Sequence, residues 1–413
     1  MQTDTLAIIL AGGVGSRLRP LTDHRTKPAV PFGGKFRIID FALANCLHSG
    51  LRQLLVLTQY KSHSLQKHLR DGWSIYNPEL GEYITPVPPQ MRSGADWYSG
   101  TADALYQNLY LLKRNRASRV LVLSGDHIYR MDYAELIKYH DEKDAMATVA
   151  CMETPIADAR RFGIMQVDTS DRVTAFQEKP ESPAPLPDDP DKALVSMGIY
   201  VFNKDLLLDL LQQDAGDPES SHDFGHNILP RLSSAGQLYS YRFGKARGRV
   251  SQDRFWQDVG TLDDYYQANM DLLRRDVPID LYQEDWTIHT YQGQHPPART
   301  VPGASGMEGM FVNSILAAGT VISGGRVNHS VLFPRVRVED GAVVEDSILF
   351  DRVKVGEGAH LRNCIVDKGV EIPPQTQIGF DPQADAKRFQ MSPGGIAVIP
   401  KYYRFDYPDP LPA

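Results

Sequence analysis

Hydrophobic and polar positions alternate in two different ways along the chain. Up to about residue 285, short β-branched runs alternate with amphipathic stretches of helical period. The runs "LAIILAG", "LRQLLVLTQ", "SRVLVLSGD" and "AMATVACME" predict strands, and "SHSLQKHLRDGW" and "MDYAELIKYHDEKD" predict helices, the second with Asp132 as its N-cap. Strands and helices in alternation are typical of an α/β fold around a mainly parallel sheet.

A repeat replaces this pattern beyond residue 310. Four similar tetrapeptides recur at steps of 16, 17 and 17 residues, beginning at Asn313, His329, Asp346 and Asn363. Apolar residues recur at steps of six in three triplets that are offset by 17, which are Leu332, Val338 and Val344, then Leu349, Val355 and Leu361, then Val366, Ile372 and Ile378. Three hexapeptides per turn predict a triangular parallel β-helix with four visible coils. The alternative is a β-rich domain with accidental alternation, which nine apolar residues in register disfavour.

The periodicity fades into Gly, Pro and polar residues between these two regions. We therefore expect an α/β domain at 1–285, a linker at 286–310 and a β-helix domain with a C-terminal tail at 311–413. A chain of 413 residues, of which 42% are hydrophobic, is long enough to bury the cores of two or three domains.

Composition excludes several classes of protein. The N-terminus lacks the pattern of a secretory signal, and no apolar run approaches the roughly 18 to 20 residues that cross a bilayer, so we expect a cytoplasmic protein without a membrane partner. Three distant cysteines without C-x-x-C spacing argue against disulfides or a zinc site. A formal net charge of -7 argues against nucleic acid as a partner.

Positive charge is nevertheless concentrated after the first predicted strand. One carboxylate, Asp23, stands among six cations, which are Arg17, Arg19, Arg25, Lys27, Lys35 and Arg37. The preceding "AGGVGSR" offers glycines and free N–H groups that suit a phosphate. It is neither a Walker A loop nor a complete dinucleotide fingerprint, and the glycines alone would indicate only a structural turn. Together with Arg17 and Lys27, they indicate a site for a polyphosphate leaving group.

These residues resemble the sugar nucleotide pyrophosphorylases, and among them the bacterial glucose-1-phosphate adenylyltransferase family. The resemblance covers nearly the whole chain and is carried by "LAGGVGSRLRPLT", "KPAVPFGGKFRIIDFALANC", "WYSGTADAL", "LSGDHIYRMDY", "EKP", "SMGIYVF", "SSHDFG", "DVGTLDDYY" and the C-terminal hexapeptides. It implies a Rossmann-like nucleotidyltransferase domain followed by a left-handed parallel β-helix. It also implies a homotetramer that makes ADP-glucose and pyrophosphate from ATP and glucose 1-phosphate with Mg²⁺, for glycogen or another α-glucan, under control by sugar phosphates and adenylates.

The resemblance also implies a role for individual residues. The catalytic residues would be Arg17, Lys27 and Asp126, and the metal ligands Asp126 and Asp258. The ATP-binding residues would be Leu10, Ala11, Gly12, Gly13, Gly15, Gln90, Trp97, Gly100, Thr101 and Asp103. The glucose 1-phosphate site would comprise Tyr98, Gly163, Glu178, Lys179 and Ser196. The effector site would comprise His24, Arg25, Arg37, Lys368 and Lys401.

Each assignment has a plainer alternative. Arg17 and Lys27 could be surface charges, Asp126 and Asp258 turn or capping residues, and Trp97 a packing residue. The chain could instead be another pyrophosphorylase, with a different base or sugar or an acyltransferase activity in its β-helix, or a non-catalytic subunit of the same architecture. His24 stands where some enterobacterial relatives carry an activator-binding lysine, and a histidine offers a phosphate less charge than a lysine at neutral pH.

Overall fold

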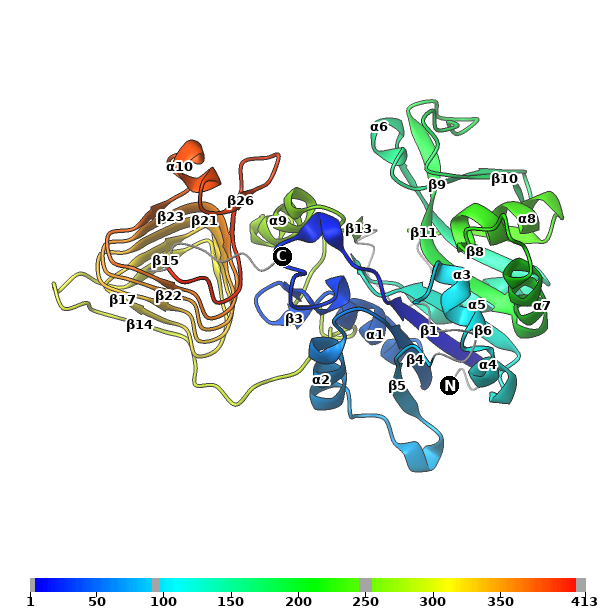
Figure 1. Cartoon of the computed structure of the whole chain (residues 1–413), viewed down its shortest axis with the longest axis horizontal. Coiled ribbons are helices and arrows are strands. Elements are labelled where there is room, and N and C mark those ends of the chain that lie inside the picture. The colour runs from blue at the N-terminus through cyan, green and yellow to red at the C-terminus, as the bar shows by residue number, and fades with distance from the viewer. Residues whose placement is uncertain (1–3, 91–96, 245–254, 406–413) are drawn as a thin grey trace.

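The structure is a computed structural model that describes residues 4–90, 97–244 and 255–405. Figure 1 shows an α/β part, which contains the N-terminus, next to a column of stacked strands. Both predicted parts of the fold are therefore confirmed. Among the described residues, no helix is long and apolar enough to cross a membrane.

A mixed, mostly parallel sheet forms the centre of the first part. Its main strands, in spatial order, are β10 (Val173–Glu178), β9 (Gly163–Val167), β11 (Lys192–Asn203), β6 (Arg119–Ser124), β1 (Thr5–Ala11), β4 (Gln53–Thr58) and β5 (Tyr83–Val87). β8 (Ala147–Pro155) joins β11 to β12 (Leu238–Arg242). β1 pairs in parallel with both β4 and β6. The carboxyl ends of these three strands therefore meet at one edge of the sheet, which is where open α/β sheets bind ligands.

Helices cover both faces of this sheet. They are α1 (Ile39–His48), α2 (His63–Gly72), α3 (Thr101–Tyr106), α4 (Leu109–Arg114), α5 (Tyr133–Glu142), α6 (Ile156–Ala159), α7 (Lys204–Ala215), α8 (Leu229–Ser234) and α9 (Leu262–Met270). Ile8 and Ile9 of β1 enter two different cores, because successive strand residues point to opposite faces. The predicted N-cap is confirmed, since the Asp132 carboxylate accepts a hydrogen bond from the Ala134 N–H at the start of α5.

The column of strands is a parallel β-helix. Its strands are β14 (Arg299–Val301), β15 (Met310–Val312), β16 (Ile315–Leu316), β17 (Val321–Ser323), β18 (Arg326–Asn328), β19 (Val331–Leu332), β20 (Arg337–Val338), β21 (Val343–Leu349), β22 (Lys354–Val355), β23 (His360–Val366), β24 (Glu371–Ile372), β25 (Gln377–Ile378) and β27 (Ala397–Ile399), with β26 (Gln390–Met391) and α10 (Pro382–Ala386) near its C-terminal end. Val338 pairs with Val355, and Val355 pairs with Ile372, which is the predicted offset of 17 residues. All nine apolar residues of the predicted triplets are at most 2% exposed.

The repeated tetrapeptides mark one corner of each coil. Their first residues, Asn313, His329, Asp346 and Asn363, have φ angles of 42°, 44°, 44° and 45°. This left-handed conformation is tolerated best, after glycine, by residues such as Asn, Asp and His. The repeat is therefore fixed by backbone geometry at the corner as well as by the apolar interior.

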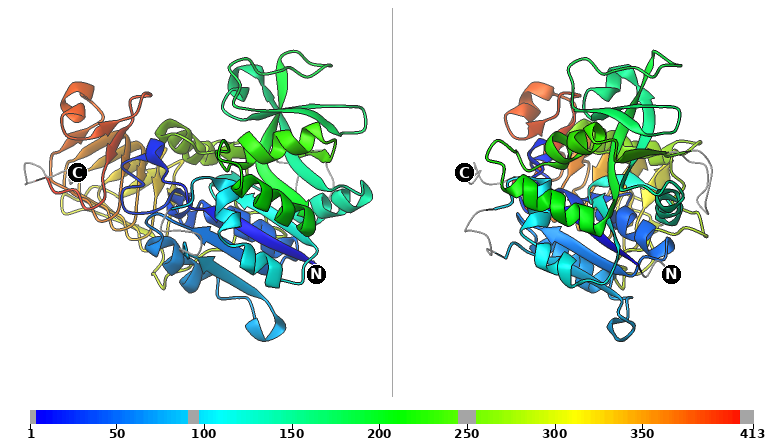
Figure 2. Two further views of the ribbon diagram at one scale, coloured as in Figure 1. Left: turned by 45° about the vertical axis from the view of Figure 1, so that its right-hand side comes forward. Right: turned by 90° about the vertical axis from the view of Figure 1, so that its right-hand side faces the viewer.

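The two parts pack together over a shared core (Figure 2). Outward-facing β-helix residues such as Ile348 and Phe350 belong to the same apolar cluster as α9, and the Tyr266 hydroxyl of α9 donates to the Asp346 carbonyl at 2.6 Å. Trp286 and Ile288 are buried, and β14 already pairs with β17 of the β-helix. The exact limits of the linker at 286–310 remain a prediction.

Candidate active site

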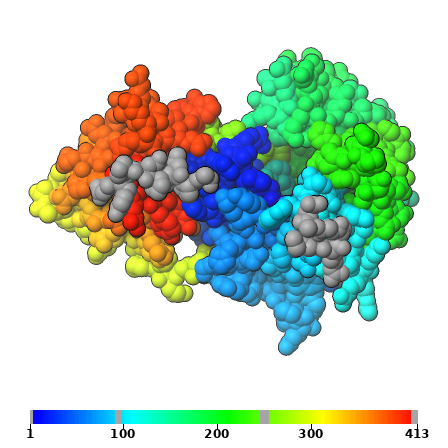
Figure 3. Space-filling view, viewed as in Figure 1, coloured from blue at the N-terminus to red at the C-terminus, as the bar shows by residue number. Residues whose placement is uncertain are grey.

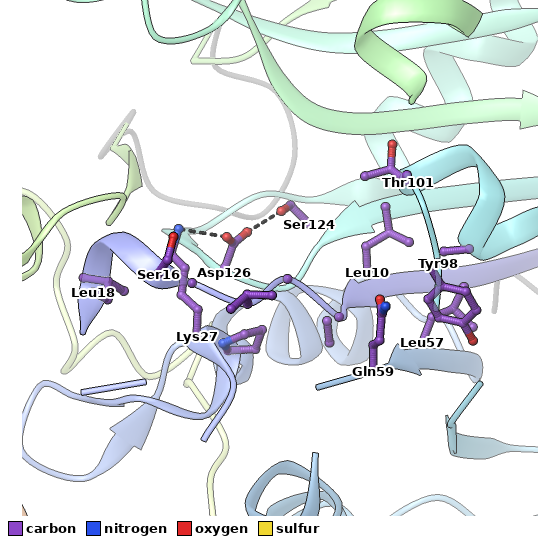
Figure 4. A pocket seen from close by; sticks show the side chains of 18 of the residues that line it. Leu10, Ser16, Leu18, Lys27, Leu57, Gln59, Tyr98, Thr101, Ser124 and Asp126 are labelled. Atoms are coloured by element: carbon purple, nitrogen blue, oxygen red, sulfur yellow. Dashed lines mark hydrogen bonds and ion pairs between the residues drawn. The ribbon is translucent and has the colours of Figure 1, made fainter. Parts of the chain in front are cut away.

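A cavity of about 590 Å³ lies at the carboxyl ends of β1, β4 and β6. Figure 3 shows the molecular surface hollowed beside the N-terminal segment, drawn in blue, and Figure 4 shows the cavity from close by. Eleven of the residues predicted for the site line the cavity, which are Leu10, Ala11, Gly12, Gly13, Gly15, Arg17, Lys27, Tyr98, Gly100, Thr101 and Asp126. The structure therefore brings together residues from four separate stretches of the sequence.

The glycine turn forms one wall of the cavity. The backbone leaves β1 at Ala11, and Gly15 has a φ of 64°, which disfavours any side chain. A Cβ atom at Gly15 would also lie 3.1 Å from the Cβ of Lys27, so the turn packs directly on the stem of that lysine. Gly13 is exposed. Apart from its chain neighbours, no described atom lies within 4 Å of the position that a Cβ atom on Gly13 would take. The turn therefore leaves room for a ligand to approach its backbone.

Lys27 lies between two carboxylates at one end of the cavity. Its Nζ is 2.8 Å from Oδ2 of Asp126 and 2.6 Å from Oδ1 of Asp258. The lysine side chain is only 9% exposed. Burial alone would lower the pKa of Lys27, but the two carboxylates raise it. Burial alone would likewise raise the pKa of Asp126. The nearby charge of Lys27, and then that of His127, instead hold this pKa well below its usual range.

Two distant segments supply these carboxylates. Asp126 follows the end of β6, where the Ser124 hydroxyl donates a hydrogen bond to its Oδ1. The next residues form β7 (His127–Tyr129), which pairs antiparallel with β13 (Trp256–Asp258), so that Asp258 stands opposite His127. The short two-stranded sheet thereby sets the distance between the aspartates. Behind it, the Thr261 hydroxyl accepts a hydrogen bond from the Asp264 N–H and caps α9.

The same aspartates fit a divalent cation. Ligand atoms of Asp126, His127 and Asp258 all lie within 4.8 Å of one another. Two carboxylates with room for phosphate oxygens are the ligands that Mg²⁺ prefers, whereas an imidazole is a poorer ligand for it. The ammonium of Lys27 between the two oxygens shows that the position already favours positive charge.

The residues predicted for ATP separate into two groups. A Cβ atom at Gly100 would collide with the His222 carbonyl oxygen, so a glycine is needed where α3 begins. The Thr101 hydroxyl donates to Asp223 Oδ2 at 2.9 Å. Three others, Gln90, Trp97 and Asp103, are not among the described lining residues of the cavity. The Asp103 carboxylate accepts hydrogen bonds from the Ser99 N–H and from the side-chain amide of Gln107. The side-chain amide of Gln90 donates a hydrogen bond to the Pro88 carbonyl. The Trp97 side chain is 59% exposed.

Apart from Tyr98, the residues predicted for glucose 1-phosphate are not among the described lining residues of the cavity. Gly163 pairs with Glu178 across β9 and β10, and a Cβ atom at Gly225 would lie 2.5 Å from the Glu178 carboxylate. Lys179, whose side chain is 58% exposed, forms an ion pair with Glu178.

Ser196 and Tyr98 complete this predicted set. Ser196 is buried on β11. Tyr98 lines the cavity, where Figure 4 shows it with Leu57 at the end away from Lys27 and Asp126. Of the predicted sugar residues, only Tyr98 contributes to the lining itself.

Sequence reasoning missed four polar residues in the lining of the cavity, which are Ser16, Gln59, Ser124 and Asp223. Gln59 and Asp223 both line it, and Asp223 also accepts hydrogen bonds from the Gly225 and His226 N–H groups. Gln59 is the last residue of the predicted strand run "LRQLLVLTQ", so the rule that ligands gather at the carboxyl ends of strands could have found it. Asp223 lies in the quoted motif "SSHDFG", but spacing alone gives no sign that it approaches Thr101.

Comparisons with known proteins agree with the fold. The family model "Nucleotidyl transferase" matches residues 6–275, and "GlmU-like, C-terminal hexapeptide" matches residues 296–399. A protein of Vibrio parahaemolyticus named glucose-1-phosphate adenylyltransferase 2 is 61% identical over 97% of this chain and 100% of its own length. The chain belongs to the glucose-1-phosphate adenylyltransferase family.

More distant relatives carry the same name. Glucose-1-phosphate adenylyltransferase 2 of Vibrio cholerae is 58% identical over 97% of this chain and 99% of its own length. Glucose-1-phosphate adenylyltransferase of Methylococcus capsulatus is 48% identical over 96% of this chain and 93% of its own length. Because these matches extend through both parts of the chain, the family assignment predicted from the motifs is confirmed.

The residues predicted for effectors lie outside the cavity, and three of them meet where the two parts of the chain join. Arg25 forms an ion pair of 2.8 Å with Asp367 of the β-helix, and both side chains are at most 3% exposed. Arg37 donates to the Ser64 hydroxyl at 2.8 Å and to the Ala29 carbonyl. Burial, and then Arg37 and Arg25, lower the pKa of Lys368 to about 7. Asp367 is far from Arg25 in sequence, so local sequence could not identify this pair.

The other two effector candidates are Lys401 and His24. The ammonium of Lys401 lies 4.6 Å from the centre of the Tyr402 ring, and the Tyr402 N–H donates to the Lys368 carbonyl at 3.1 Å. His24 is exposed next to buried Arg25.

Proposed function

We propose that this chain transfers the adenylyl group of ATP to glucose 1-phosphate, which forms ADP-glucose and releases pyrophosphate. The observation that supports this most directly is the position of Lys27 between Asp126 and Asp258, at the end of a cavity that begins at the glycine turn. The cavity offers phosphate-binding backbone, two cations and two carboxylates. It offers no arrangement that requires a covalent enzyme intermediate, so direct in-line attack of the sugar phosphate is the simplest chemistry.

In this proposal each wall of the cavity has one role. The backbone of the glycine turn binds the phosphates of ATP, while Arg17 and Lys27 stabilise the charge that develops on the departing pyrophosphate. Asp126 and Asp258 would hold Mg²⁺, which when bound neutralises charge on the phosphates. Catalysis is then positioning and electrostatic stabilisation, with the residues held in place by β6, β7 and β13.

The sugar is proposed to bind on the side of Asp223. Glu178 and Asp223 both approach the position that a Cβ on Gly225 would take, and carboxylates suit sugar hydroxyls as hydrogen-bond acceptors. Gly163 leaves room for Glu178, and exposed Lys179 is free of the core and could reach a sugar phosphate at the rim. Gln90 and Trp97 stand on either side of residues 91–96, which lie outside the described residues, and both are proposed to approach the base.

Pyrophosphate release from ATP and glucose 1-phosphate, with Mg²⁺ present or chelated, tests the proposal. We expect release only with both substrates and the metal. Competition by other nucleoside triphosphates and sugar phosphates would detect a different pyrophosphorylase. The absence of release with any pair of substrates would favour a non-catalytic subunit instead. A cytoplasmic location stays a prediction of the sequence.

We further propose that sugar phosphates and adenylates bind near Arg37, Lys368, Lys401 and His24. The support is an excess of cations where the two parts join, since Arg25 is neutralised by Asp367, whereas the described hydrogen bonds of the Arg37 guanidinium go to uncharged oxygens and only its backbone N–H donates to the Asp40 carboxylate. Titration of the protein with fructose 1,6-bisphosphate and AMP, followed by pyrophosphate release, tests this site.

The β-helix is proposed to mediate assembly into a homotetramer. Met310, Phe311 and Val312 of β15 are 43%, 49% and 52% exposed, at the first coil of the column. In the described structure β15 pairs on one side only, with β18. Exposed apolar edge strands are unusual unless another chain covers them. Light scattering of the wild type and of Phe311→Asp tests this assembly.

A further inference from the structure

The ammonium of Lys27 lies where a divalent cation would be expected. A cation held by Asp126 and Asp258 would need the same two oxygens that Nζ contacts at 2.8 and 2.6 Å. The second oxygen of Asp126 is already engaged, because it accepts a hydrogen bond from Ser124 and lies 3.6 Å from His127 Nε2. A divalent cation and an ammonium cannot both lie within bonding distance of these two oxygens without strong repulsion.

We propose that Lys27 is an internal counter-ion that holds the metal position closed until ATP binds. This inference rests on the proposed assignment of Asp126 and Asp258 as metal ligands. In the absence of ATP, the ammonium neutralises the two carboxylates, and the protein binds divalent cations weakly. When ATP binds, its phosphates attract the ammonium away from the carboxylates, and these become available to the metal. Metal and nucleotide therefore bind cooperatively.

The surroundings of Lys27 allow this exchange without movement of the backbone. Lys27 begins a short 3-10 helix, η2 (Lys27–Ala29), whose three residues are all buried. Its Cβ lies 3.1 Å from the position that a Cβ on Gly15 would take, so the lysine stem runs along the turn proposed to bind the phosphates. Rotation of the flexible end of the side chain would therefore carry Nζ from the carboxylates towards the phosphates.

The net charge of the site indicates whether the Lys27 ammonium or a divalent cation is favoured there, first without ATP and then with ATP bound. Two carboxylates and one ammonium leave one negative charge, which is too little to attract a divalent cation strongly. The Arg17 guanidinium lies nearby as well, because a Cβ on Gly260 would be 3.3 Å from Asp258 Oδ2 and 3.5 Å from Arg17 Nη2. Only the added negative charge of nucleotide phosphates restores a site that favours Mg²⁺.

The experiment measures Mn²⁺ binding by electron paramagnetic resonance with wild type, Lys27→Met and Lys35→Met, without nucleotide. Lys35→Met is the matched control, because Lys35 is exposed and its ammonium lies 5.2 Å from the centre of the Phe36 ring. We expect Lys27→Met to bind Mn²⁺ at least about tenfold more tightly than wild type, since a like charge is removed from the site. The control should match wild type. Equal or weaker Mn²⁺ binding by Lys27→Met would overturn the proposal.

Two further measurements complete the test. Mn²⁺ should raise the melting temperature of Lys27→Met more than that of wild type, and saturating α,β-methylene-ATP should increase Mn²⁺ affinity more in wild type than in the variant. Equal gains in both proteins would also contradict the proposal. Lys27→Gln repeats the comparison if Lys27→Met does not fold.

Controls separate this inference from the proposed function. Adding Asp126→Asn to Lys27→Met should abolish the gain in Mn²⁺ affinity, and a gain that persists would refute the assignment of the metal ligands. Pyrophosphate release by wild type tests the proposed activity independently. Normal release together with unchanged Mn²⁺ binding in Lys27→Met would reject the counter-ion role alone.

Discussion

The ion pair between Arg25 and Asp367 should make a large contribution to the stability of the contact between the two parts of the chain. We consider Asp367→Asn, which keeps the shape of the side chain and removes its charge. Arg25 is 3% exposed and Asp367 1% exposed, with 2.8 Å between Nη2 and Oδ1. Loss of one partner from a buried pair costs about 3–5 kcal/mol, because the other charge remains buried without compensation. The Leu21 carbonyl, at 3.2 Å from Nη1, and the Phe350 ring offset only part of this cost.

The expected loss can be measured by calorimetry. An unfolding entropy of about 2.1 cal/mol/K per residue, applied to all 413 residues, converts a loss of about 3 kcal/mol to a melting temperature lower by about 3–4 °C. The control is Asp71→Asn, which removes surface pairs with Lys67 and Arg70, whose side chains are 60% and 73% exposed, and should leave the melting temperature close to that of the wild type. The double variant Arg25→Met/Asp367→Leu should recover part of the loss. A melting temperature for Asp367→Asn equal to that of the control would refute the reasoning.

Three further predictions concern activity. Asp126→Asn should lower kcat by at least about a hundredfold, as expected for an electrostatic catalytic group, and a folded variant with near-normal kcat would contradict its role. Lys179→Gln should raise KM for glucose 1-phosphate and leave KM for ATP nearly unchanged, whereas the reverse would show that the subsites are exchanged. Because the pKa of Lys368 is about 7, this lysine gains its proton as pH falls from 8 to 6.5, and activation by fructose 1,6-bisphosphate should need less effector there. The effector phosphate also gains protons, so the comparison includes His24→Lys, which should bind the activator more tightly at pH 8. Unchanged activation constants would exclude these cations from effector binding.

Stability should respond to the same lysine in a defined direction. The unfolded chain binds a proton on Lys368 up to its ordinary pKa of 10.5, whereas the folded chain releases it near pH 7. Between these values the unfolded state holds more protons, so the contribution of Lys368 to stability rises with pH. The cost of burying this charge is therefore greatest at low pH and disappears at high pH, whereas the charged form that an anion would bind is favoured at low pH. An effector phosphate near Lys368 would therefore be bound with uptake of a proton.

Much of this fold could be predicted because its determinants are local and repeated. The apolar positions of the β-helix recur at fixed steps, and each repeat has a polar residue such as Asp346 at the left-handed corner. The strands that end at Ala11 and Ser124 are short apolar runs followed by glycine, which places their carboxyl ends without knowledge of the rest of the structure. Both signals depend only on the period of side chains along a strand.

The site could be predicted in part, for a related reason. Gly15 and Asp126 lie in motifs that follow strand ends, and Lys27 lies in the next motif along the chain. The structure brings all three residues to one cavity. The role of Asp223 depends instead on the packing of its loop against Thr101, and sequence contains no period or spacing that reports such a contact. The cluster of cations around Arg25 is visible in the sequence, but the counter-ion of Arg25 is not. Asp367 comes close to Arg25 only after the β-helix packs on the first domain.

The two domains therefore depend on each other at the residues that carry chemistry. The segment between Gly15 and Lys27 contains Arg25, which is fixed to the β-helix by Asp367. The segment after Asp258 continues into α9, where the Asp263 carboxylate accepts hydrogen bonds from Ser392 and from the Gly394 N–H in the turn between β26 and β27. Both sides of the proposed metal position are thus connected to the same β-helix. A shift of the β-helix relative to the first domain would change the distance between Lys27 and Asp258, which gives a physical reason why an anion bound where the two parts join could alter activity.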